Sequence, residues 1–246
     1  MLDSPTRDDA PPTASARMRL LPRRNRAQRL EQARSAAMDF AAVPPDPARR
    51  APLWHVPVPL PVPSEVTPPP LVWLLGAHGG AGVSTLERLL APAADCRRQW
   101  PAVLAGESPY VLVVARETLD GLSRAHDLLR QWHSGGAGNR AHLLGLVTSA
   151  HQPGHMPAQI KRYLQVVEML APNRWRLDWQ PDWPVTQLED LPVWRPFDEP
   201  PAKGRDPLAA IRQLGDALVN EVRAIECAAP ASESGTGSAD PMEALP

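Results

Sequence analysis

A buried-strand pattern that leads straight into a glycine-rich turn and a helix constrains this chain more than any other segment. Residues 71–75 (LVWLL) are apolar throughout, residues 76–82 (GAHGGAG) contain four glycines, and residues 84–90 (STLERLL) have helical character. Such a turn leaves backbone N–H groups pointing into one concavity at the start of a helix, an arrangement that suits phosphate. The same glycines are equally compatible with a tight turn that binds nothing.

Further strands and helices follow this loop in alternation. We predict strands over 110–115, 143–148 and 174–178, and helices over 119–132, 158–170 and 206–225. Because parallel strands need crossover connections, this alternation predicts a three-layer α/β domain with a mostly parallel sheet covered by helices on both faces.

Prolines define the expected limits of this domain. Of 31 prolines, 15 fall in residues 1–70, which predicts a disordered, proline- and arginine-rich tail with one short basic helix between Arg17 and Ala42. The packed domain is expected over residues 71–227, and residues 228–246 are expected to form a second disordered tail.

Composition indicates a soluble cytoplasmic protein. The formal net charge is -1, so the chain as a whole has no electrostatic bias toward nucleic acid or an anionic membrane. The two cysteines, Cys96 and Cys227, form no disulfide framework or metal-ligand spacing. The polar start lacks the pattern of a signal peptide, and no apolar run reaches membrane-spanning length.

The glycine loop resembles a known motif. Residues 79–85 (GGAGVST) are similar to the deviant Walker A sequence GGxGK[ST][ST] of the ParA/MinD family of P-loop NTPases. Val83 stands where that motif has its P-loop lysine, and His78 stands where it has a second, signature lysine. The runs 111–132 and 142–151 and the region 178–194 also resemble the family in pattern.

The resemblance implies a P-loop fold that binds ATP or another nucleotide, with magnesium only when nucleotide is bound. The elements that lie between the first helix and the 110–115 strand in the family, including the strand that ends in the Walker B aspartate, are expected to be missing here. Arg116 follows a strand on the same sheet edge as the loop and is a candidate replacement cation, although a solvent-facing role is the alternative. The candidate nucleotide-binding residues are Gly79, Gly80, Ala81, Gly82, Val83, Ser84, Thr85 and Arg116.

Without the lysine and the Walker B aspartate, hydrolysis by the family mechanism is not expected. We therefore interpret the chain as a degenerate ParA/MinD-like protein that binds phosphate or nucleotide without turnover and serves as a regulatory or partner-binding module. One alternative is an active ATPase that uses an unconventional cation such as Arg116, and another is a structural adaptor with a vestigial loop.

Several other features of the sequence allow two interpretations each. Trp175, Trp179, Trp183 and Trp194 either cover the sheet edge or supply a ring that stacks on a purine. His78 is either a weak phosphate donor or a spectator. A protein partner or self-association is expected, whereas nucleic-acid binding through the arginine-rich segment is less favoured than a tether. No histidine has a metal-site spacing, so no metal site of the protein's own is expected.

Overall fold

One parallel sheet forms the centre of the molecule. The structure is a computed structural model and describes residues 26–54, 70–101, 107–204 and 206–228. The strands are β1 (Val72–Gly76), β2 (Ala93–Asp95), β3 (Tyr110–Arg116), β4 (His142–Ser149) and β5 (Arg174–Leu177), all parallel and in the order β2-β1-β3-β4-β5. The α/β class and the parallel sheet predicted from the sequence are confirmed.

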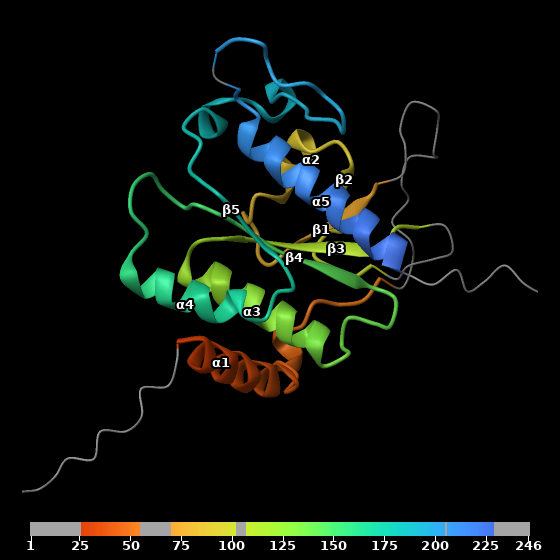
Figure 1. Ribbon diagram of the computed structural model, residues 1–246, viewed down its shortest axis with the longest axis vertical. Helices are drawn as coiled ribbons and strands as arrows, with labels where there is room; N and C mark the ends of the chain where they lie inside the picture. Colours follow the sequence, from red (N-terminus) through yellow and green to blue (C-terminus); the bar gives the residue numbers. More distant parts are fainter. Residues whose placement is uncertain (1–25, 55–69, 102–106, 205, 229–246) are drawn as a thin grey trace, which may run out of the picture.

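Helices cover both faces of this sheet (Figure 1). They are α1 (Arg26–Ala41), α2 (Val83–Leu89), α3 (Leu119–His133), α4 (Ala158–Glu168) and α5 (Ala209–Ala228). Two buried clusters divide the core accordingly: α3 and α4 pack on one face, and α2 and α5 pack on the other. The chain is therefore wound in two directions from β1, first through α2 to β2 and then through α3 and α4 to β4 and β5.

The apolar run in β1 is explained by this double cover. Trp73 and Leu75 join the cluster on the α3 and α4 face, while Val72 and Leu74 join the cluster on the α2 and α5 face. Successive side chains of a strand point to opposite faces, so a strand buried on both sides has no polar alternation. The indole N–H of Trp73 donates to the Ser108 carbonyl oxygen at 3.0 Å, which satisfies its polar atom.

The strand β2 corrects one expectation from the sequence. No strand was expected between the first helix and the 110–115 strand, yet β2 lies beside β1 and ends at Asp95. Its register places Asp95 level with Leu74, and the Asp95 Oδ1 accepts from the backbone N–H of Arg97 at 2.6 Å. This carboxylate therefore stabilises a turn. A strand of three residues with the sequence AAD has little β propensity, which explains why no pattern predicts it.

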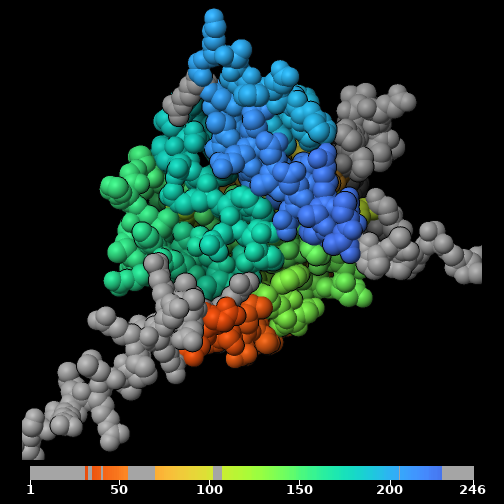
Figure 2. All heavy atoms as spheres, viewed as in Figure 1, coloured from red at the N-terminus to blue at the C-terminus, as the bar shows by residue number. Residues whose placement is uncertain are grey.

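The N-terminal boundary is a second correction, because packed structure begins well before residue 71. The helix α1 lies within the segment where a short basic helix was expected, and Ala41 and Trp54 are almost fully buried in the α3-side cluster. Trp54 meets Trp73 edge to face, with ring centroids 5.0 Å apart. Figure 2 shows the first coloured residues of the chain, drawn in orange, lying directly against the rest of the domain. The expected disorder of residues 1–25, 55–69 and 229–246 concerns segments outside the described residues.

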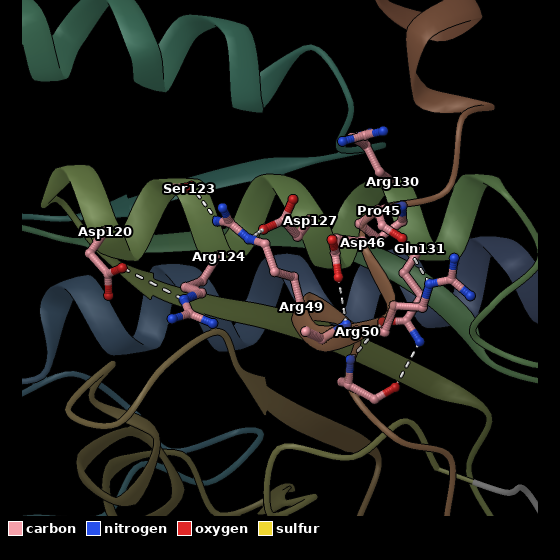
Figure 3. A network of polar contacts seen from close by, with 12 residues as sticks. Pro45, Asp46, Arg49, Arg50, Asp120, Ser123, Arg124, Asp127, Arg130 and Gln131 are labelled. Atoms are coloured by element: carbon pink, nitrogen blue, oxygen red, sulfur yellow. Dashed lines mark hydrogen bonds and ion pairs between the residues drawn. The ribbon is translucent and has the colours of Figure 1, made fainter.

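Polar contacts fix residues 43–54, which we call the strap, along α3 (Figure 3). Arg130 donates to the carbonyl oxygens of Val43 and Pro44, and the Arg49 guanidinium lies 2.5 Å from the Asp127 carboxylate. These contacts join side chains to backbone or to single partners, so they leave no periodic sequence signal. The strap is consequently part of the folded domain.

One further prediction concerns membranes. Within the described ranges, no helix combines the length and the apolar composition needed to cross a bilayer.

Candidate functional site

A cavity of about 330 Å³ opens at the carboxyl edge of the sheet. It lies between the glycine loop with α2 and the segments that follow β3, β4 and β5. In a doubly wound sheet, ligands bind outside the carboxyl ends of the strands, where the winding direction reverses. That reversal falls between β1 and β3 here, so the glycine loop after β1 and Arg116 at the end of β3 mark its two sides.

The structure brings together half of the eight residues proposed from the sequence. Ala81, Gly82, Thr85 and Arg116 line the cavity. Gly79 and Gly80 are exposed in the loop and are not among its lining residues, whereas Ser84 faces a separate groove beside α2 and Val83 packs inward.

The position of Val83 has a simple packing cause. Its side chain is partly buried against the α2 and α5 core, and its Cγ2 lies so close to Gly76 that a Cβ on that glycine would be 2.9 Å away. A larger residue than glycine at position 76 would therefore collide with the side chain of Val83. The residue at the lysine position of the resembled motif belongs to the core of this protein.

His78 braces the loop against the end of β3. Its Nε2 accepts from the backbone N–H of Arg116 at 3.3 Å, so the ring hydrogen resides on Nδ1, which donates to the Gly79 carbonyl oxygen at 2.8 Å. Gly121 leaves room for this ring, because a Cβ there would lie 2.8 Å from Nε2. The structure thus gives His78 a positioning role that neither sequence interpretation included.

Two polar atoms at this cavity have no hydrogen-bond partner among the residues that the structure describes. The Nε of Arg116 and the Oγ of Ser149 are both buried and unpartnered, and both residues line the cavity from the ends of neighbouring strands. Arg116 forms no ion pair with any of the described residues, whereas five other arginines do. A buried donor without an acceptor is costly, so the Nε of Arg116 favours an anion or another acceptor in the cavity.

Glu117 belongs to an ion-pair network beside the cavity, and this network was not predicted from the sequence. Its buried carboxylate accepts from the Arg176 Nε at 2.7 Å and Nη2 at 3.0 Å, and from the Thr148 hydroxyl at 3.2 Å. The remaining side of the Arg176 guanidinium contacts Asp178. The hydrogen bond to Glu117 raises the pKa of Arg176, which keeps its guanidinium charged. It ties together the ends of β3, β4 and β5.

The four C-terminal tryptophans lie in two parts of the structure. Trp175 packs against the α2 and α5 core, and Trp194 is fully buried there against Gly215, where a Cβ would lie 2.1 Å from the indole. Trp179 and Trp183 line the cavity. Two indoles therefore share the cavity with Arg116, and one of these, Trp183, also packs against the α2 and α5 core.

Fold and site together define a doubly wound α/β protein with a basic, tryptophan-bordered cavity at its topological switch point. Among the residues that the structure describes, no group of three or more His, Cys, Asp or Glu side chains is placed to hold a metal ion. Comparison of the chain with protein-family models, curated proteins and solved structures finds no match.

Proposed function

We propose that this protein is a degenerate ParA/MinD-like P-loop module that binds the phosphate groups of a nucleotide without hydrolysing it. The observation that carries the proposal is the unpaired Arg116, which lines the cavity next to the glycine loop with its buried Nε unsatisfied. In this proposal Arg116 supplies the positive charge that the resembled motif obtains from a lysine.

The chemistry of the neighbouring groups supports an anionic ligand. The Arg guanidinium offers a planar fork of donors that matches phosphate oxygens, and Ser149 and Thr85 add hydroxyl groups from two other elements. Gly82, at φ 98°, lets the loop turn in a conformation that L side chains rarely adopt, and a Cβ there would lie 4.0 Å from the Ser149 Oγ. The carboxylate of Asp178, which also lines the cavity, forms an ion pair with Arg176.

Binding without turnover is supported by the two positions that phosphoryl chemistry would use. Val83 packs in the core where the motif has its lysine, and the carboxylate of Glu117 is fully engaged by Arg176 and Thr148. Neither group is free to stabilise a transferring phosphoryl group. The module therefore acts through the bound state, by presenting a surface to a protein partner or to a second copy.

Calorimetric titration with pyrophosphate, ATP and GTP, each with and without magnesium, tests this function. Arg116→Gln is expected to weaken pyrophosphate binding by about ten- to a hundredfold, because a charge-assisted contact is lost. Arg174→Gln is the matched control, since Arg174 is also on a strand but is exposed and away from the cavity.

Two results would overturn the proposal. If the wild-type protein binds none of these anions at millimolar concentration, the loop is only a turn and the adaptor interpretation holds. If nucleotide is turned over with magnesium and Thr85→Ala or Arg116→Gln abolishes the turnover, the protein is a hydrolase.

A further inference from the structure

A second hollow of about 320 Å³ lies on the other side of the same strand ends. Its lining is largely apolar and comes from the start of α3 and from the loop that leads into α4, including Leu119, Met156, Pro157 and Ile160. Leu119 is 44 % exposed although it is apolar, because it faces this open hollow. A space of this size and character suits a planar ring.

The two hollows meet along one rim. His151 lines both hollows. Arg116 and Asp178 line the first hollow, whereas Glu117, which follows Arg116, and Arg176, which is paired with Asp178, line the second. From the glycine loop to the end of β4 the sheet spans two ladder steps, about 10 Å. The sugar and phosphates of a nucleotide bridge such a gap.

Arg176 gives the second hollow a stacking surface. Its guanidinium edges are occupied by Glu117 and Asp178, so the plane is held in one orientation while the side chain stays 39 % exposed. A fixed guanidinium plane stacks on nucleobases as an aromatic side chain does. The two flanking histidines, His151 and His155, offer ring nitrogens for the edge of a base.

We infer that the ligand is a nucleotide whose phosphates bind at Arg116 and whose base occupies the hollow formed by Leu119, Met156, Ile160 and Arg176. This inference rests on the proposed function for the phosphate end and adds the site of the base. It places the base on the side of α3 and α4, away from Trp179 and Trp183.

The test compares three probes on the full chain: pyrophosphate for the anion alone, adenosine for the ring alone, and ADP for both. We expect ADP to bind at least about tenfold tighter than pyrophosphate. Leu119→Asn changes the polarity of the side chain at nearly constant size. It is expected to weaken the binding of ADP and adenosine about tenfold and to leave the affinity for pyrophosphate unchanged. Val166→Asn is the matched control, because Val166 is an apolar helix residue of similar exposure outside the hollow.

The outcomes distinguish the proposed phosphate site at Arg116 from the proposed base site in the second hollow. ADP affinity that survives Leu119→Asn but falls with Trp179→Ala or Trp183→Ala places the base in the Arg116 cavity and overturns the inference. ADP that binds no tighter than pyrophosphate also overturns it. Adenosine binding that is lost in Leu119→Asn, together with no pyrophosphate binding, supports the ring site and refutes the phosphate function. Absence of binding by all three probes refutes both.

Discussion

The side-chain amide of Gln131 and the backbone of Ala51 exchange two hydrogen bonds across a sequence separation of 80 residues. Gln131 donates from Nε2 to the Ala51 carbonyl oxygen at 2.7 Å and accepts from the Ala51 N–H at 2.8 Å. The amide is nearly inaccessible to solvent, and its Nε2 also donates to the Gly136 carbonyl oxygen. The side chain thus pairs with the strap as a neighbouring β-strand would.

Removing this amide is expected to destabilise the fold. Gln131→Ala leaves the N–H and C=O of Ala51 without their partners, which costs about 2–4 kcal/mol in the free energy of unfolding. Urea unfolding followed by circular dichroism measures this change. Gln165→Ala, on the exposed side of α4, is the control and should unfold like the wild type. An equally small effect in both variants would mean that the strap contributes nothing to stability.

Trp54 is expected to be the main apolar anchor of the strap. Trp54→Ala removes a side chain that is 3 % exposed and packed on Trp73, at a cost of about 3–5 kcal/mol. Leu53→Ala changes the adjacent residue, which is 36 % exposed, and should cost less than about 1 kcal/mol. The midpoint of chemical unfolding distinguishes the two. In the wild type, limited proteolysis should protect the strap together with residues after 70, and rapid cleavage within residues 43–54 would contradict the packing described.

Restoring a lysine in the glycine loop is expected to harm the protein. Val83→Lys forces a longer side chain into the space against Gly76 and should cost about 1–3 kcal/mol of stability. Pyrophosphate affinity, measured by calorimetry on the folded variant, should not rise. Ser84→Lys introduces the same charge at the adjacent exposed position and should leave the thermal midpoint unchanged. A stable Val83→Lys variant with tighter binding would show that the loop still accepts the motif's lysine.

His126 is expected to make stability depend on pH. Burial, with a further contribution from Arg130, lowers the pKa of His126 below its ordinary value of 6.5. As pH falls below that value, the unfolded chain takes up the proton before the folded one does, so the folded state loses stability until its own lower pKa is passed. His126→Phe removes the titrating group and keeps a ring beside Tyr163; the centroids of the His126 and Tyr163 rings are 6.2 Å apart.

Melting temperatures between pH of about 7.5 and 5 check this sign. The decrease toward acid should be smaller in His126→Phe than in the wild type. Gln165→Phe introduces the same ring at an exposed, non-titrating position of α4, serves as the control and should keep the wild-type slope. Identical slopes in all three proteins would mean that the proton on His126 is not coupled to folding.

The central fold was predictable because its signals are local and repeated. Apolar runs identified β1, β3 and β4, and helical spacing identified α3, α4 and α5, each within a few residues of its bounds in the structure. The strap left no such signal, because Gln131 and Arg49 hold it through contacts between distant residues. Strand β2 is too short for any periodicity to be read.

The site was predictable only where position in the sheet decides it. Arg116 was proposed because a residue after a parallel strand lies at the same edge as the loop, and it does line the cavity there. The inward packing of Val83 depends on Gly76, and the engagement of Glu117 depends on an arginine 59 residues away. The sequence does contain a signal for that ion pair, because Glu117 and Arg176 lie at the ends of two strands of one parallel sheet. Whether the two side chains are close enough to pair can be predicted only when the order of the strands is known.

The strap depends for its native contacts on residues that are synthesised later. Ala51 leaves the ribosome long before Gln131 exists, and Trp73, the ring that Trp54 packs against, belongs to a sheet whose later strands are still unmade. Chains emerge N-terminus first, so the strap remains an unpaired apolar and basic segment until α3 has formed. The strap, although translated early, therefore reaches its native contacts only after α3 has formed, and a nascent chain halted before residue 131 exposes Trp54 to any chaperone or protease that meets it.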